Sequence, residues 1–182
     1  MEKGYKNIFV GIFLATFNIR IGIIQIVPAF VGWIVALNGI NNIRNENDNE
    51  YYEQAARYGS RLVFLSLLGS LLELLGIGSM FEPISSFFII IVNIFEFLTI
   101  SKIIEATSDY FRLMNKEDLC LEYEGKKKSY SILTFIMIIG LFISLIIQND
   151  LIMQLCGYLA IIIRIYVMIM VNRVRNIEMG NI

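Results

Sequence analysis

Apolar residues gather in three long blocks that alternate with polar segments. The blocks run over residues 8–43, 62–100 and 131–171. One helical crossing of a bilayer needs about 20 residues, so each block is too long for one crossing and suits two short ones. The pattern predicts an all-α integral membrane protein of three helical hairpins, in which residues 1–182 form a single membrane domain.

Each block is interrupted near its middle, as a hairpin requires. Polar residues, Gly or Pro lie at 18–28, 76–83 and 148–150. The first block is the hardest to divide, because its opening apolar run is short. Residues 18–27 suit an extended or re-entrant stretch, so the prediction is either six short spans or four spans and a re-entrant N-terminal hairpin.

Basic residues give an independent test of this threading. Of the 15 Lys and Arg residues, 13 lie in the four polar segments, and the predicted turns at 79–84 and 148–150 contain none. Basic segments stay in the cytoplasm, and hairpins place all four polar segments on one side. We therefore expect both termini inside, in a multi-pass protein of a bacterial cytoplasmic membrane; abundant Ile, Asn and Lys with only 2 Pro suit an AT-rich bacterial genome.

Two polar segments connect the predicted hairpins. Residues 42–52, rich in Asn and acidic side chains, resemble a solvated loop. Residues 101–129 begin with apolar positions at helical spacing, which predicts an amphipathic cytoplasmic connector. Three successive lysines near its end could contact anionic lipid or serve only as a topology determinant. They are Lys126, Lys127 and Lys128.

Four ionisable residues interrupt the apolar blocks: Arg20, Glu73, Glu96 and Arg164. Charges inside a bilayer are costly unless they pair or reach water. Counting from the predicted turns places Glu96 and Arg164 at similar depth in the inner half. Counting from Lys6 and Leu62 places Arg20 and Glu73 in the outer half. We expect two internal pairs with polar neighbours such as Asn93, one helical turn from Glu96. Such pairs either hold the bundle together or line a polar pocket.

Small and aromatic residues add packing signals. Gly11 with Ala15 and Gly32 with Ala36 have the four-residue spacing that lets helices approach closely, here within the chain. Aromatic residues near block ends suit the membrane interface. They are Tyr5, Trp33, Tyr58, Tyr130 and Tyr158.

The composition agrees with a membrane protein and argues against an enzyme or a metal-binding protein. Apolar residues make up 57% of the chain and charged residues 17%, against about 45–50% and 25% in globular proteins. The chain has no His, the commonest metal ligand and general base. No nucleophile elbow, phosphate-binding loop or metal-ligand spacing occurs. We expect no catalytic residues, no metal or other cofactor and no nucleic-acid partner.

The segment Ile26-Val27-Pro28-Ala29-Phe30-Val31-Gly32-Trp33-Ile34 resembles an Ile-x-Pro-Asp-Phe-Ile-Gly-Tyr stretch near the start of small uncharacterised membrane proteins of Gram-positive bacteria. Here Ala29 replaces the acidic residue and Trp33 the Tyr. The resemblance implies a multi-span protein without a settled activity, and the Ala29 difference removes any role of that carboxylate.

Two classes of function fit these features. The first is a non-enzymatic binding protein: an accessory subunit, an immunity factor against a membrane-active peptide, or a regulator. Its partners would be the lipid bilayer and another membrane protein or such a peptide. The second is a small carrier or channel with an intramembrane site for a lipid headgroup, ion or small solute.

Overall fold

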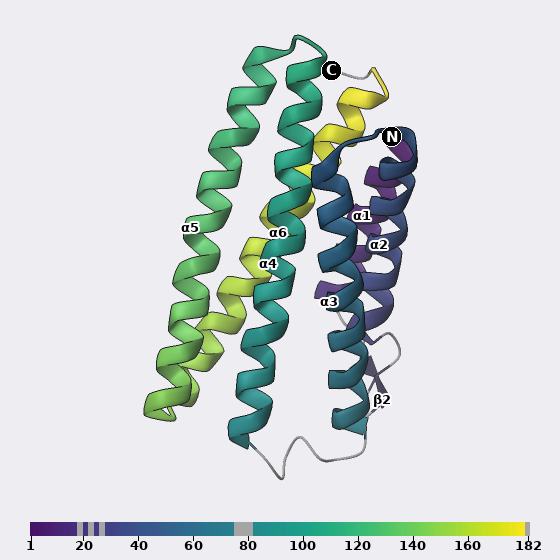
Figure 1. Cartoon of the computed structure of the whole chain (residues 1–182). Coiled ribbons are helices and arrows are strands. Elements are labelled where there is room, and N and C mark those ends of the chain that lie inside the picture. Colours follow the sequence, from purple (N-terminus) through teal and green to yellow (C-terminus); the bar gives the residue numbers. More distant parts are fainter. Residues whose placement is uncertain (18–19, 22–23, 26–27, 75–81, 181–182) are drawn as a thin grey trace.

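The protein is an up-and-down bundle of long helices (Figure 1). The computed structural model describes residues 1–17, 20–21, 24–25, 28–74 and 82–180, with the side chains at 20–21, 24–25, 73 and 82–85 outside that description. The described helices are α1 (Glu2–Thr16), α2 (Ala29–Glu46), α3 (Glu50–Leu74), α4 (Glu82–Leu113), α5 (Glu117–Ile147) and α6 (Asp150–Glu178). The all-α prediction is confirmed.

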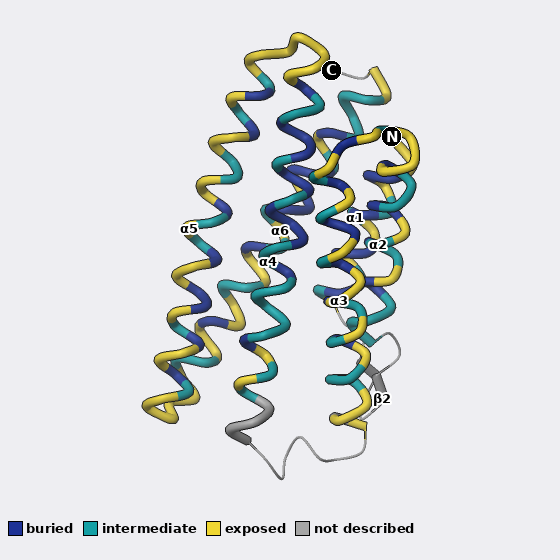
Figure 2. Tube along the Cα trace, viewed as in Figure 1, coloured by how far each residue is buried: buried dark blue, intermediate teal, exposed yellow. Residues whose placement is uncertain are grey.

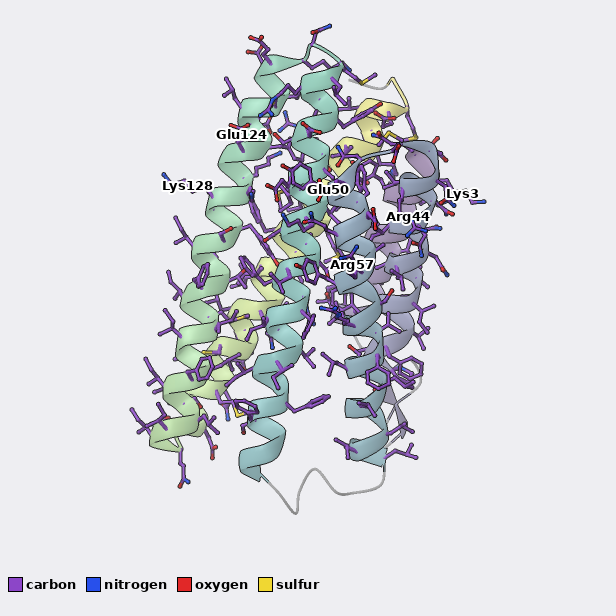
Figure 3. The ribbon with its side chains drawn as sticks, viewed as in Figure 1. Lys3, Arg44, Glu50, Arg57, Glu124 and Lys128 are labelled. Atoms are coloured by element: carbon purple, nitrogen blue, oxygen red, sulfur yellow. The ribbon has the colours of Figure 1, made fainter. Side chains whose placement is uncertain are left out.

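The helices follow one another around a ring. Each of α1 to α5 packs against the next helix in the chain, and α6 packs against α1 as well as α5. Both termini lie at one end of the bundle, with the α2–α3 and α4–α5 turns (Figure 1). We call this end the polar end, because the charged residues labelled in Figure 3 lie in its half of the bundle. Large buried side chains from all six helices fill the ring, among them Tyr5, Ile40, Leu62, Ile100 and Tyr123.

Three of the described helices are long and apolar enough to cross a membrane: Ser86–Leu113 of α4, then α5 and α6. Figure 2 shows exposed residues along their outward faces, and many of these residues are large and apolar. On α5, for example, Ile132, Ile136 and Ile139 are exposed while Thr134 and Met137 are buried. Contiguous exposed apolar surface of this extent is characteristic of a lipid-facing wall and indicates membrane association.

The long helices also include most of the polar segments that composition had suggested were connectors. The 32 residues of α4 span about 48 Å and the 31 residues of α5 about 46 Å, both beyond the roughly 30 Å of a bilayer core. Residues 101–129 are therefore not a separate connector: they belong to the polar ends of α4 and α5, joined by a turn at 114–116 in which Asn115 has φ 56°.

The 42–52 segment differs from its prediction in the same way. The α2 helix continues to Glu46, and α3 begins at Glu50. Between them, Asn49 Oδ1 accepts a hydrogen bond from Tyr51 N at 2.8 Å and caps the new helix. Polar composition marks solvated helix ends as readily as loops, which is why the predicted loop was too long.

At the opposite end, the α1–α2 and α5–α6 turns lie at two of the predicted breaks in the apolar blocks. The third predicted break, at 76–83, falls mostly outside the described residues. Between α1 and α2, strand β1 (Arg20–Ile21) pairs antiparallel with β2 (Ile24–Gln25), so these four residues of the stretch predicted to be extended or re-entrant are extended. Residues 18–19, 22–23 and 26–27 of that stretch lie outside the described residues. Between α5 and α6, Gln148 has φ 53°, and Asn149 Oδ1 accepts from Leu151 N at 3.0 Å and Ile152 N at 3.2 Å. In the α5–α6 turn, Asn149 thus gives two backbone N–H groups a partner, as a membrane environment requires.

Candidate functional site

Glu96 on α4 and Arg164 on α6 form a two-point ion pair inside the ring. Arg164 Nε donates to Glu96 Oε1 at 2.7 Å, and Nη2 donates to Oε2 at 2.5 Å. Glu96 is 6% exposed, and the Arg164 side chain is 20% exposed. The planar guanidinium matches both carboxylate oxygens, which gives the contact a defined geometry. The structure thus brings together two residues whose positions in the sequence predict equal depth.

A third helix completes this contact. The Arg164 guanidinium carbon lies 5.8 Å from the ring centroid of Trp33 on α2, within cation–π range. Trp33 is buried, as are Tyr5 and Tyr130, so these three are not the interfacial aromatics that their places near block ends predicted. Tyr158 is exposed, as expected. Position along a helix fixes depth in the membrane, whereas the face of the helix decides whether a ring meets lipid or the interior.

The polar neighbours of the pair surround very little space. Asn93, Glu96, Tyr130 and Thr134 line a cavity of about 10 Å³, room for roughly one water. Asn93 Nδ2 donates to the Ile89 carbonyl at 2.8 Å, and Thr134 Oγ1 donates to the Tyr130 carbonyl at 2.8 Å. Asn93 therefore lies beside Glu96 as predicted, with a hydrogen bond to its own helix. A lipid headgroup or a hydrated ion does not fit in this cavity.

The second predicted pair falls outside the described part of the chain. Arg20 belongs to β1 and Glu73 to the last turn of α3, and the side chains of both lie outside that description. Their pairing stays a prediction.

The three lysines of α5 have different surroundings. Lys126 Nζ lies 2.7 Å from Glu122 Oε1 and 4.3 Å from the Tyr123 ring centroid. Lys127 Nζ lies 3.2 Å from Glu105 Oε1 on α4. Lys128 is exposed and extends away from the bundle (Figure 3). The run predicted as one lipid-contacting cluster is thus divided around the helix, because successive residues lie about 100° apart.

A buried chain of hydroxyl groups joins three helices near the polar end. Tyr5 Oη lies 2.6 Å from Tyr52 Oη and 2.8 Å from Thr107 Oγ1, and Thr107 Oγ1 donates to the Ile103 carbonyl at 2.7 Å. Since the Thr107 proton is used, Tyr5 donates to Thr107 and Tyr52 donates to Tyr5. Burial raises the pKa of both tyrosines, so their hydroxyls stay protonated at neutral pH.

Sequence reasoning missed this chain of hydroxyls. Thr107 lay on the apolar stripe of the 101–129 segment, and that was the available signal: a hydroxyl on a helix face that is otherwise buried needs a partner. The partner could not be identified, because it depends on how α1 and α3 pack against α4.

The order of donors along this chain of hydroxyl groups predicts unequal effects of two similar substitutions. Tyr5→Phe should lower the free energy of unfolding by about 2 kcal/mol, because it leaves the buried Tyr52 proton and the Thr107 oxygen without partners. Tyr52→Phe removes only the terminal donor and should lower it by about 1 kcal/mol. Thermal unfolding in detergent measures both, with Tyr158→Phe on the exposed surface as a control near zero. A larger loss for Tyr52→Phe would contradict the donor order.

The contacts of the buried charges described above are to each other and to the Trp33 ring. Both hydrogen bonds of the Glu96 carboxylate described above go to the guanidinium of Arg164. In the described part of the chain, no group of three or more His, Cys, Asp or Glu side chains is placed to hold a metal ion.

Comparison with known proteins gives no relative from which a role could be taken. No protein-family model, no curated protein and no solved structure matches this chain.

Proposed function

We propose that this protein is a non-enzymatic binding protein of a bacterial cytoplasmic membrane, acting as an accessory subunit, an immunity factor or a regulator. Its partner would be another membrane protein or a membrane-active peptide. The polar end, with both termini, would face the cytoplasm and carry the binding surface. The concentration of basic side chains in the segments that form this end supports that orientation.

The observation that carries the proposal is the closed surroundings of the Glu96–Arg164 pair. The pair is bidentate, Trp33 lies against it, and the adjoining cavity measures about 10 Å³. A carrier or channel needs polar groups that a solute can reach and displace. The alternative function as a small carrier or channel therefore needs an opening of the bundle at this level.

The N-terminal hairpin favours one of the two threading schemes. The 15 residues of α1 span about 22 Å, short of the roughly 30 Å hydrocarbon core. The last turns of α2 contain Asn41, Asn42 and Arg44, which shortens its apolar part further. We therefore propose a re-entrant α1–α2 hairpin beside four spans. Either scheme leaves both termini on the same side.

Reaction of introduced cysteines with a membrane-impermeant thiol reagent separates the two functions. In a background without the free cysteines Cys120 and Cys156, Thr134→Cys places a thiol at the cavity beside Glu96. We expect it to stay unlabelled in intact and in inverted vesicles. Lys128→Cys should be labelled only in inverted vesicles, and the lipid-facing Ile139→Cys in neither.

Each outcome has a distinct meaning. Labelling of Thr134→Cys, with Ile139→Cys still unlabelled, would show that water reaches the pair and would favour the carrier or channel. Labelling of Lys128→Cys in intact rather than inverted vesicles would overturn the cytoplasmic placement of the polar end. Labelling of all three positions from both sides would overturn membrane insertion itself.

A further inference from the structure

A groove of about 650 Å³ opens between α4 and α5 near the polar end, within the size range of small-molecule sites. Its α5 wall runs from Glu124 to Phe135, about 16 Å along the helix axis. Figure 3 labels two residues of this wall, Glu124 and Lys128. The polarity and charge of this wall change along its length, and the order of these changes indicates which ligand fits the groove.

The part of the groove nearest the membrane span is apolar. Ile132 and Phe135 line it, and both are exposed on the outer face of α5. The exposed apolar face of α5 continues below them through Ile139 to Ile147. A hydrocarbon chain lying against α5 would therefore enter the groove without crossing a polar rim.

The middle of the groove has an excess of positive charge. Lys127 and Lys128 line it from α5, and Glu105 faces them from α4. Glu105 also binds Lys102 at 2.9 Å, in addition to Lys127 at 3.2 Å. Lys102 and Lys127 thus share one carboxylate, and Lys128 adds a further positive charge to the lining of the groove. An ammonium group has three donors, so Lys127 and Lys128 retain capacity for an anion.

The part farthest from the span has the opposite balance. Arg112 Nη2 donates to Glu124 Oε1 at 2.7 Å, and its Nη1 lies 3.7 Å from Asp109 Oδ1. Two carboxylates thus share one guanidinium. Glu124 is one helical turn from Lys128, about 6 Å along the axis, so the negative level lies directly beyond the positive one.

From the order of these three levels, apolar, then positive, then negative, we infer that the groove binds a phospholipid whose phosphate is followed by a primary amine. The acyl chains lie along Ile132 and Phe135, the phosphate meets Lys127 and Lys128, and the ammonium group meets Glu124 and Asp109. The inference rests on the proposed placement of the polar end at the membrane surface and names the ligand class there.

The same chemistry separates this lipid from two others of similar shape. Phosphatidylethanolamine presents an ammonium group with N–H donors to the two carboxylates. Phosphatidylcholine has the same charge but presents methyl groups, and phosphatidylglycerol presents uncharged hydroxyls. The anionic lipid predicted from the lysine run alone is thus disfavoured by the carboxylates that α4 and α5 add.

Quenching of tryptophan fluorescence by brominated lipids tests the site in the full chain, reconstituted in vesicles. Phe135→Trp places the probe in the groove, and Ile139→Trp places a matched probe on the same helix outside it; both native side chains are 55% exposed. The signal of buried Trp33, measured in the unsubstituted chain, is subtracted. Brominated phosphatidylethanolamine should occupy the groove about fivefold more favourably than either competitor, which corresponds to about 1 kcal/mol. Ile139→Trp should show no preference.

Two charge variants then identify the contacts. Adding Glu124→Gln to Phe135→Trp should remove the preference over phosphatidylcholine, and adding Lys128→Gln should weaken occupancy by all three lipids. Equal quenching of Phe135→Trp by the three lipids, or a preference that survives Glu124→Gln, would overturn the inference while the membrane placement stands. Absence of quenching at both probe positions would overturn the membrane placement and this site with it.

Discussion

The Arg164→Met variant should lose about 3–5 kcal/mol of folding free energy, because it leaves the Glu96 carboxylate buried without its partner. Glu96 is 6% exposed in the intact pair, so removal of Arg164 leaves its carboxylate inside the bundle without a charged partner. The melting temperature in detergent and the amount of protein in the membrane should both fall.

The Glu96→Gln variant should be less severe. The Arg164 side chain is 20% exposed, has a long apolar stem and keeps its contact with the Trp33 ring. Its guanidinium can also shift toward water, as long cationic side chains do in membranes. The unequal loss distinguishes a buried anion from a partly exposed cation.

Double substitutions separate pairing from mere polarity. Exchanging the charges, with Glu96→Arg and Arg164→Glu together, should restore part of the stability lost in either single reversal. Replacing both residues by Leu should be tolerated better than Arg164→Met alone, because well-packed apolar residues often replace a buried ion pair without loss. If each double variant is as unstable as the worse of its single variants, the two residues do not act as a pair.

The contact between Glu96 and Arg164 could be predicted because so few charges interrupt the apolar blocks. Counting residues from the breaks at 76–83 and 148–150 places Glu96 and Arg164 at one level, and a helix converts residue number into depth at 1.5 Å per residue. The breaks themselves carry turn signals in the sequence. The helical fold class, the breaks in the apolar blocks and the level of a residue along its helix therefore depend on local sequence.

The face that each residue presents could not be predicted in the same way. Trp33 and Tyr5 have the sequence positions of interfacial aromatics, yet both are buried. Their neighbours, Arg164 in one case and Tyr52 with Thr107 in the other, come from helices distant in the chain. An aromatic ring with a polar tip suits either surrounding, so only the packing of the ring of helices decides.

The groove between α4 and α5 shows a second limit. The composition of residues 101–129 predicts a polar connector with a lysine cluster, and it correctly identifies the charged residues of this segment. The opposing carboxylates become relevant only because two continuous helices run side by side and align Glu105 with Lys127 and Arg112 with Glu124. A charge pattern along one helix does not reveal the pattern across two.

The second large effect is expected where α1 meets α2. A Cβ atom added at Gly11 would lie 2.4 Å from Ala36 N, and one added at Gly32 would lie 2.4 Å from Ala15 N. Both obstacles are backbone atoms of a facing helix, so they cannot turn aside. Gly11→Ala and Gly32→Ala should therefore each destabilise the protein by about 1–3 kcal/mol, although Ala favours a helix over Gly. A fall in the melting temperature in detergent would measure this destabilisation.

Two other helical glycines provide the matched controls. A Cβ at Gly125 on α5 or Gly157 on α6 would meet nothing within 4 Å. Gly125→Ala and Gly157→Ala should therefore gain about 0.5–1 kcal/mol from the reduced flexibility of the unfolded chain. The same chemical change then has opposite signs at two kinds of site, which separates backbone contact from helix propensity. A gain at Gly11 or Gly32 would mean that α1 and α2 do not touch at these positions, and the ring would be open there.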